Sequence, residues 1–145
     1  MKSFFIILLL IFTSQAIAEK PLVDGNVDDV KTFGYWEENG KNGIFRLVIT
    51  SSGFEHIHNQ VYAQWLEENE EKRIVLKSTW IAELDMLHSP VVEIEEIQVE
   101  SKSTVVHLAL TNPYSLESSL ASLHLFNEPP IYKFVLGAKS GSEGH

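Results

Sequence analysis

Hydrophobic and polar residues alternate with a period of two along most of the chain. In the stretch IFRLVIT, Phe45, Leu47 and Ile49 share one face, whereas Arg46 lies on the other. The segment TVVHLALT, at residues 104–111, repeats this alternation. Such a pattern is typical of strands that bury one face. The β-branched and aromatic residues that dominate these segments also favour strands, so the chain is predicted to be all-β.

Turn signals separate the alternating segments. Two Asn-Gly pairs, Asn39-Gly40 and Asn42-Gly43, indicate a hairpin because both residue types accept a positive φ. Prolines and short polar runs mark the other breaks. We therefore predict a mostly antiparallel sandwich of seven or eight strands, with a small barrel as the alternative. The expected strands span residues 31–37, 44–51, 54–66, 73–84, 91–100, 104–111, 121–126 and 131–136.

The segment VVEIEEIQVE, at residues 91–100, breaks its own alternation. Its first apolar pair and its second apolar pair have opposite parity, so a regular strand would place them on opposite faces. A β-bulge at Glu95-Glu96 would return both pairs to one face. The two pairs are Val92 with Ile94, and Ile97 with Val99. We predict this bulge.

The segment SLESSLASLHLF, at residues 115–126, fits two patterns. Leu116, Leu120 and Leu123 have the spacing of one helical face, whereas residues 121–126 alternate as a strand does. A short helix near residues 115–123 is therefore predicted as an alternative for this part of the chain.

The N-terminal residues have the composition of a secretory signal peptide. Lys2 supplies a positive charge, the apolar run FFIILLLIF follows, and the small residues AIA end at Ala18. Nine apolar residues are too few to cross a membrane, since a spanning helix needs about 20. We expect residues 1–18 to be removed, leaving no membrane anchor and a protein that is periplasmic or secreted.

The remaining residues have the length of one domain. We expect a polar lead-in at residues 19–30, a single β domain at residues 31–137 and a flexible tail at residues 138–145. The chain contains no cysteine, so it can form neither disulfides nor thiolate metal sites.

The charge of the chain is strongly acidic. Removal of Lys2 with the signal peptide leaves ten basic against 20 acidic residues, a net charge of −10. Nucleic acid is an unsuitable partner, because its binding depends on neutralising phosphates with Lys and Arg. A protein partner in the envelope or outside the cell, in particular a basic one, would be attracted. A charge that only keeps the protein soluble is the simpler interpretation.

Two histidines in the segment SSGFEHIHNQVYAQW form a His-x-His pair. On a regular strand, His56 and His58 would stand side by side on the outer face. Pairs of this kind bind copper or zinc when a third and usually a fourth ligand is present. The residues expected to point inward from the same strand are Ile57, Val61, Ala63 and Trp65.

A neighbouring strand would have to supply the remaining ligand. His107, Glu83 and His88 are the candidates, and the sequence does not show which of them lies next to the pair. Without such a ligand, the two histidines are simply polar residues on the solvent-facing side of a strand.

Aromatic residues could form a platform that binds a sugar or a protein. Parity places Trp65 and Trp80 on inward faces, together with the core. Tyr35 and Trp36 adjoin the predicted hairpin, and the alternation requires one of them to face outward. An exposed aromatic residue there indicates a partner-binding surface, so Tyr35 and Trp36 are the predicted contact residues.

Catalytic motifs are weak by comparison. The sequence has no G-x-S-x-G nucleophile motif. A hydrolase would need a cleft lined by paired carboxylates, or by Ser and His within hydrogen-bond reach. We therefore expect a small secreted or periplasmic β-sandwich that binds a partner and does not catalyse. The alternative is a periplasmic copper- or zinc-binding protein that uses His56 and His58.

Overall fold

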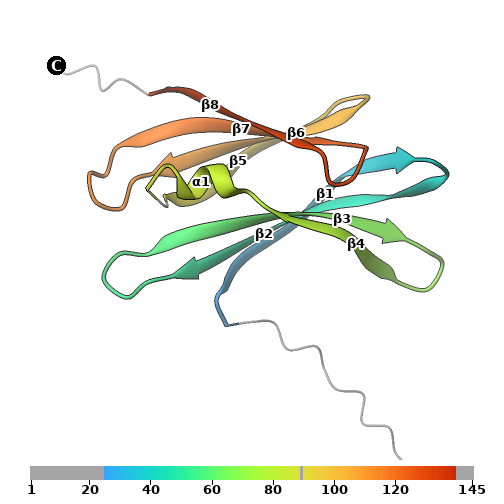
Figure 1. Ribbon diagram of the computed structural model, residues 1–145, viewed down its shortest axis with the longest axis horizontal. Coiled ribbons are helices and arrows are strands. Elements are labelled where there is room, and N and C mark those ends of the chain that lie inside the picture. Colours follow the sequence, from blue (N-terminus) through green and yellow to red (C-terminus); the bar gives the residue numbers. More distant parts are fainter. Residues whose placement is uncertain (1–24, 89, 140–145) are drawn as a thin grey trace, which may run out of the picture.

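The chain forms eight strands in two antiparallel sheets (Figure 1). The computed structural model describes residues 25–88 and 90–139. The elements are β1 (Val27–Glu38), β2 (Lys41–Ser52), β3 (His58–Glu68), β4 (Arg73–Trp80), α1 (Ala82–Asp85), β5 (Val91–Val99), β6 (Ser103–Thr111), β7 (Ser118–Phe126) and β8 (Tyr132–Lys139). Sheet A has the strand order β1-β2-β3-β4, and sheet B has the order β5-β6-β7-β8. The predicted all-β fold with eight strands is confirmed.

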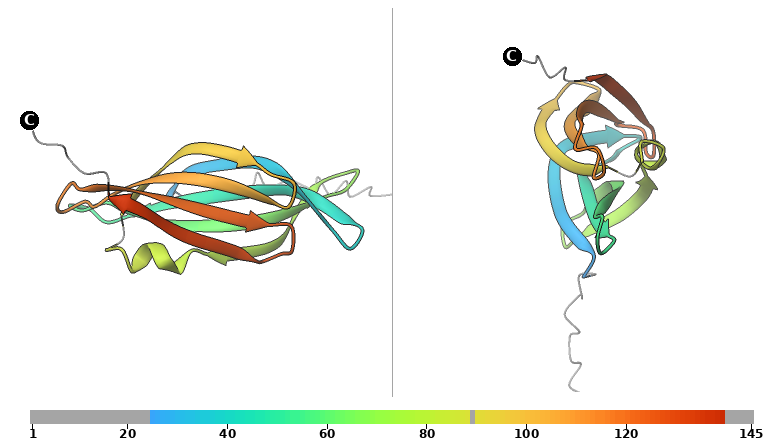
Figure 2. Two further views of the ribbon diagram at one scale, coloured as in Figure 1. Left: turned by 90° about the horizontal axis from the view of Figure 1, so that it is seen from above. Right: turned by 90° about the vertical axis from the view of Figure 1, so that its left-hand side faces the viewer.

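The two sheets pack face to face and do not close into a barrel, which confirms the sandwich and removes the barrel alternative. Each sheet is a simple meander, in which every strand pairs with its neighbour in the sequence. Seen end-on, β1 lies beside β5 on one side, and α1 lies between β4 and β8 on the other (Figure 2). Residues 81–90, which include α1, connect sheet A to sheet B.

The core consists of the inward faces of both sheets and the short helix. The predicted inward residues of β2, β6 and the second half of β3 are all buried, as alternation required. Phe45 and Trp65 meet edge to face with ring centroids 5.9 Å apart. The buried cluster comprises Trp36, Phe45, Leu47, Ile49, Val61, Ala63, Trp65, Ile81, Leu84, Val92, Val106, Leu108, Leu110, Ala121, Leu123 and Leu125.

Polar side chains also connect the two sheets. The Nε1–H of Trp65 donates to the carbonyl oxygen of Phe126 in β7, at 2.8 Å. The buried side chain of Asn59 in β3 accepts a hydrogen bond from the backbone N–H of Val92 in β5, at 2.7 Å. Directed bonds of this kind fix the position of one sheet on the other, which apolar packing alone does less precisely.

The helix α1 is held against sheet B by a hydrogen bond. The hydroxyl of Tyr132 in β8 donates to the Oε2 atom of Glu83, at 2.9 Å. Partial burial, the hydrogen bond to Glu83 and its negative charge together raise the pKa of Tyr132 to about 12. The helix therefore covers the side of the sandwich between β4 and β8 (Figure 2).

Only one of the two Asn-Gly pairs forms a turn. Asn39 and Gly40 both have positive φ, of 52° and 75°, and they join β1 to β2 as a two-residue hairpin turn. Gly43 lies within β2 instead, where a Cβ atom would collide with the backbone carbonyl of Leu66. The second pair therefore serves close strand packing and not a turn.

The predicted bulge is present in β5. Ile94 pairs with Leu108 and Glu96 pairs with His107, so Glu95 is the extra residue. The bulge brings Ile94 and Ile97 to the same face, where both pack against the core. Val99 does not follow them, because it lies at the end of the strand and is exposed.

A second bulge, in β4, was not predicted. Leu76 is an extra residue between the partners of Trp65 and Leu66. It shifts the alternation by one position, so that Trp80 pairs with Tyr62 on the outer face. The prediction that Trp80 faces the core is therefore wrong, and its side chain is 42% exposed.

Several expected elements have different bounds or types. The first strand begins at Val27 and not at residue 31, so it includes the end of the expected polar lead-in at residues 19–30. Residues 54–57 form a loop and not the start of β3, because the hairpin needs several residues to turn after Gly53. Residues 82–85 form α1 and not the end of β4. The helix proposed near residues 115–123 is wrong, since β7 occupies residues 118–126 and pairs on both sides within sheet B. The expected signal peptide at residues 1–18 lies outside the described residues.

Candidate functional site

The two histidines of the His-x-His pair occupy different structures. His58 begins β3, and its Nε2 atom lies 2.8 Å from the Oγ atom of Ser52. His56 lies in the loop of residues 53–57, where it packs against Tyr114 with ring centroids 4.5 Å apart. The pair therefore does not stand side by side on one strand, as regular alternation would have placed it.

Two of the three residues considered as further metal ligands have other contacts. His107 lies in β6 and contacts Ser122, whereas Glu83 lies in α1 and binds Tyr132. Among residues 25–88 and 90–139, no group of three or more His, Cys, Asp or Glu residues is arranged to hold a metal ion. The copper or zinc site at His56 and His58 stays a prediction.

Large apolar side chains gather at the end of the sandwich where His56 lies. This end, which we call the tip, is formed by the β2–β3 loop, the β6–β7 loop and the residue that follows α1 (Figure 1). Phe54 is 100% exposed, and Leu116 is 75% exposed. The exposed apolar residues of the tip are Phe54, Ile57, Met86, Tyr114 and Leu116. Ile57 was expected to point inward and does not, because it precedes the strand.

The β6–β7 loop at the tip has a defined conformation. The Oδ1 atom of Asn112 accepts hydrogen bonds from the N–H groups of Tyr114 and Ser115, at 2.8 and 3.1 Å. The backbone of Asn112 also bonds to Leu116 and Glu117. Leu116 has a φ of 60°, which is unusual for a bulky residue and costs conformational energy. The loop thus holds Tyr114 and Leu116 outward by its own hydrogen bonds.

The charges of the tip are all negative among the residues described there. Glu55 and Glu117 lie in the two loops, and Asp85 ends α1. No Lys or Arg is found at residues 53–57, 85–88 or 112–117. The tip therefore combines exposed apolar side chains with a rim of carboxylates.

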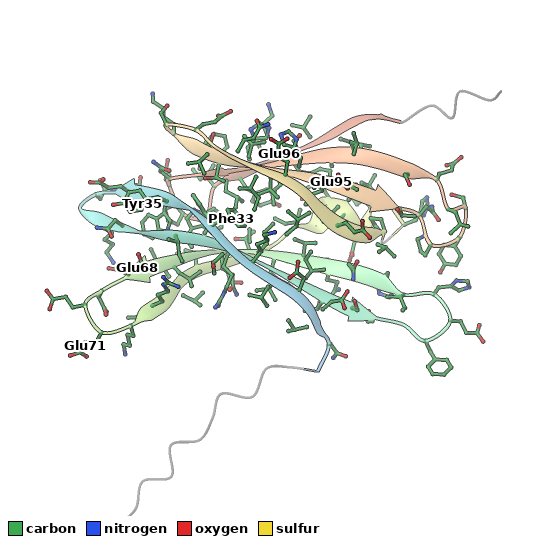
Figure 3. All side chains as sticks on the ribbon, turned by 180° about the vertical axis from the view of Figure 1, so that it is seen from behind. Phe33, Tyr35, Glu68, Glu71, Glu95 and Glu96 are labelled. Carbon is green, nitrogen blue, oxygen red and sulfur yellow. The ribbon has the colours of Figure 1, made fainter. Side chains whose placement is uncertain are left out.

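Tyr35 and Trp36 separate as the alternation required. Trp36 is 1% exposed, and its Nε1–H is shared between the carbonyl oxygens of Ile44 and Leu66, at 3.2 Å each. Tyr35 is exposed on β1, toward the end opposite the tip (Figure 3). Trp36 is a core residue that no partner can reach, so only Tyr35 is available for the predicted contact.

The bulge in β5 adjoins a hollow on the outer face of sheet B. The hollow has a volume of about 610 Å³, and Glu95 and Glu96 form part of its wall. Both side chains project from β5, as Figure 3 shows. His107 and Ser122 lie beside them, with the Oγ atom of Ser122 3.2 Å from the Nδ1 atom of His107. The apolar part of the wall comes from Leu120 and Val135.

This hollow has some features of a hydrolytic site but not its full geometry. Glu95 and Glu96 are consecutive residues on one strand, so they do not flank a bond from two sides as glycosidase carboxylates do. Acyl transfer needs free N–H donors for the oxyanion. The backbone around Ser122 and His107 is paired in the β5–β8 ladder instead.

Comparisons with known proteins give no assignment. No protein-family model, no curated protein and no solved structure matches this chain. Among the described residues, no helix has both the length and the hydrophobicity required to span a membrane. The chemistry of the chain's own surfaces therefore has to carry any functional assignment.

Proposed function

We propose that this protein is a small secreted or periplasmic β-sandwich that binds a protein partner through its tip and does not catalyse a reaction. The observation that carries the proposal is the gathering of Phe54, Tyr114 and Leu116 in the solvent-exposed loops of the tip. Exposed apolar side chains that gather at one end of a domain usually mark an interaction site. Loops at the ends of a sandwich are common binding surfaces, because the rigid sheets fix their positions.

The chemistry of the tip defines the partner. Phe54 and Leu116 would enter an apolar cleft, as anchor residues do at the centre of protein interfaces. Glu55 and Glu117 lie in the same two loops, Asp85 ends α1, and these carboxylates would meet basic residues at the rim of that cleft. The partner is therefore a protein with an apolar cleft and a basic rim. An anionic membrane surface would be repelled by the same carboxylates.

The hydrogen bonds of the tip support binding by a preorganised surface. Asn112 fixes the β6–β7 loop, and the contact between His56 and Tyr114 connects that loop to the β2–β3 loop. A loop that is already ordered loses less conformational entropy when a partner binds.

The test compares three forms of the protein without residues 1–18, each immobilised and exposed to envelope extract. The wild type and the control Val75→Ser/Val99→Ser should capture the same protein, because Val75 and Val99 are exposed apolar residues outside the tip. The variant Phe54→Ser/Leu116→Ser should lose it. With the purified partner, this variant should bind at least about tenfold more weakly, which corresponds to about 1.4 kcal/mol.

The salt dependence provides a second readout. Raising the salt concentration should weaken wild-type binding through the carboxylate rim but should not abolish it, because the apolar contacts remain. Equal capture by the tip variant and the wild type, or no captured protein at any salt concentration, would contradict the proposal.

A further inference from the structure

An apolar row crosses the outer face of sheet A. The strand register makes Val30, Val48, Tyr62 and Trp80 direct neighbours on β1, β2, β3 and β4. Register partners on adjacent antiparallel strands point to the same side of a sheet. Because Leu47 and its partner Ala63 are buried in the core, the alternating residues Val48 and Tyr62 point to the other side of the sheet, toward solvent. We call it the aromatic row.

A polar row runs beside the aromatic row. Thr32, Arg46, Gln64 and Ser78 are register partners, each two residues along its strand from a member of the aromatic row. The Nε–H of Arg46 donates to Gln64 Oε1 at 2.7 Å, and the Nε2–H of Gln64 donates to Ser78 Oγ at 3.1 Å. These bonds hold planar polar groups across three strands, with hydrogen-bonding capacity left over on the guanidinium and the amide.

The two rows contain no carboxylate. The whole chain has 20 acidic residues against 11 basic ones, yet Arg46 is the single formal charge in these rows. The two rows thus carry no negative charge and a single positive charge, on an otherwise acidic protein. A basic ligand would find no carboxylate to bind there, and a nucleic acid would find only one cation.

We propose that the aromatic row and the polar row form a binding platform for a neutral saccharide chain. A sugar ring has an apolar C–H face and a rim of hydroxyl groups. The C–H face would pack on Tyr62 and Trp80, which have large flat surfaces and lose little entropy when they are ordered. The hydroxyl groups would exchange hydrogen bonds with Arg46 and Gln64, which offer both donors and acceptors.

The dimensions of the platform fit a short oligosaccharide segment. Adjacent strands are about 4.8 Å apart, so a row of four residues spans about 14 Å. Alternate residues on a strand are about 6.7 Å apart, so a sugar ring on the aromatic row brings its hydroxyl rim to the polar row. The platform lies on a sheet face and not at the loops, so it is independent of the tip.

The tryptophans provide a specific readout. Trp36 and Trp65 are buried, at 1% and 0% exposure, so Trp80 alone among the three tryptophans is open to solvent. A saccharide on the platform should protect Trp80 from quenching by acrylamide and change the tryptophan fluorescence. Dextran, laminarin, mannan and hydroxyethylcellulose serve as neutral probes, and heparin serves as the anionic comparator.

Affinity electrophoresis through gels that contain each probe measures binding by the protein without residues 1–18. We expect at least one neutral probe to retard the wild type. Trp80→Ala should weaken that binding at least about tenfold, and Gln64→Ala should weaken it about threefold or more. Tyr35→Ala is the matched control, because Tyr35 is an exposed aromatic residue of the same sheet outside both rows, and it should bind as the wild type does.

The outcomes separate the proposal from its competitors. Retardation by heparin alone would show ion pairing with Arg46 and overturn the proposal. Retardation that persists in both Trp80→Ala and Gln64→Ala, or no retardation and no protection of Trp80 by any neutral probe, would also overturn it. A dimer in sedimentation that Trp80→Ala dissociates would show that a second copy covers the face. The variant Phe54→Ser/Leu116→Ser should keep saccharide binding, so a failure of the tip proposal leaves this one standing.

Discussion

The imidazole of His56 lies against the ring of Tyr114, with ring centroids 4.5 Å apart and ring planes inclined at 41°. His56 belongs to the β2–β3 loop of sheet A, and Tyr114 belongs to the β6–β7 loop of sheet B. The contact therefore joins the two sheets at the tip, although His56 and Tyr114 are far apart in the sequence. Exposed ring pairs of this kind contribute about 0.5–1.5 kcal/mol at most, so the contact orders loops more than it stabilises the fold.

Removal of this ring contact should loosen one loop without unfolding the protein. In Tyr114→Ala, we expect faster hydrogen exchange at the amides of residues 53–57, because His56 loses its packing partner. The midpoint of thermal unfolding should change by only a few degrees. Tyr35→Ala, which removes an exposed tyrosine at the other end of the molecule, is the control. Unchanged exchange in the loop would show that the ring contact does not order it.

Asn59 should be the most costly polar residue to remove. Its Nδ2–H group donates to the Oγ atom of Ser51 at 2.8 Å and to the carbonyl oxygen of Thr50 at 3.4 Å, and its Oδ1 atom accepts from Val92. Asn59→Ala leaves the buried N–H of Val92 without this partner. We expect the free energy of unfolding to fall by about 2–3 kcal/mol in urea titrations. Gln98→Ala, on an exposed position of β5, should change it by less than about 0.5 kcal/mol.

Thr104 presents the opposite case. Its Oγ1 atom is buried and has no hydrogen-bond partner among the described residues. Gly34 lies so close that a Cβ atom on Gly34 would be 2.6 Å from this Oγ1 atom. Thr104→Val replaces the unpaired hydroxyl with a methyl group of similar size. We expect the free energy of unfolding to rise by about 1 kcal/mol, because the cost of burying the hydroxyl disappears. A loss of stability in Thr104→Val, with Thr32→Val neutral, would contradict this account.

Alkaline pH should expose the contribution of Tyr132. Its pKa is about 12 in the folded protein against 10.0 for an unperturbed tyrosine, because burial and Glu83 disfavour the phenolate. The folded state thus holds this proton more tightly than the unfolded state does. The associated stability is fully present below about pH 10 and is lost as the pH rises from about 10 to about 12.

Urea titrations between pH 9 and pH 11.5 measure this effect. The wild type should lose stability more steeply with pH than Tyr132→Phe, which has no phenol at this position. Tyr35→Phe controls for the removal of a tyrosine. Equal slopes for the wild type and Tyr132→Phe would show that the contact with Glu83 does not hold the proton.

The metal hypothesis has its own test. If His56 and His58 bind copper or zinc, calorimetric titration of the protein with each ion should give a one-to-one complex. His56→Ala/His58→Ala should then bind at least about tenfold more weakly, since it lacks two imidazole ligands. His124→Ala, which removes a histidine of β7 that is not among the candidate ligands, is the control. Equal weak binding by the double variant and the wild type would remove the hypothesis.

Alternation predicted the regular parts of the sandwich well. Val61, Ala63 and Trp65 point inward, as do Phe45 and Leu47, because a buried face leaves only one register acceptable. The bulge at Glu95 was also predictable, since two apolar pairs of opposite parity leave no other way to bury both. The sequence therefore contained the architecture and one of its irregularities.

The surfaces were harder to predict because they depend on single-residue shifts and loop bounds. Trp80 faces outward because Leu76 adds one residue to β4, and the apolar pattern of that edge strand is too loose to reveal the shift. Phe54 and Ile57 were predicted to lie in a strand, because apolar residues in the long hairpin loop continue the alternation of the strand that follows. Gly53, with a φ of 103°, was the available signal for that loop.

The simple meander order of both sheets has a consequence for how the chain assembles. Residues 27–80 contain every strand partner of sheet A, and residues 91–139 contain every strand partner of sheet B. Each half can therefore complete its backbone ladders locally, and each lacks only the apolar face that the other supplies. Residues 81–90 join two complementary fragments, and they add Ile81 and Leu84 to the core. Cutting the chain after α1 should leave these two residues on the sheet A fragment and give pieces that reassemble on mixing, so the protein is suited to use as a split reporter.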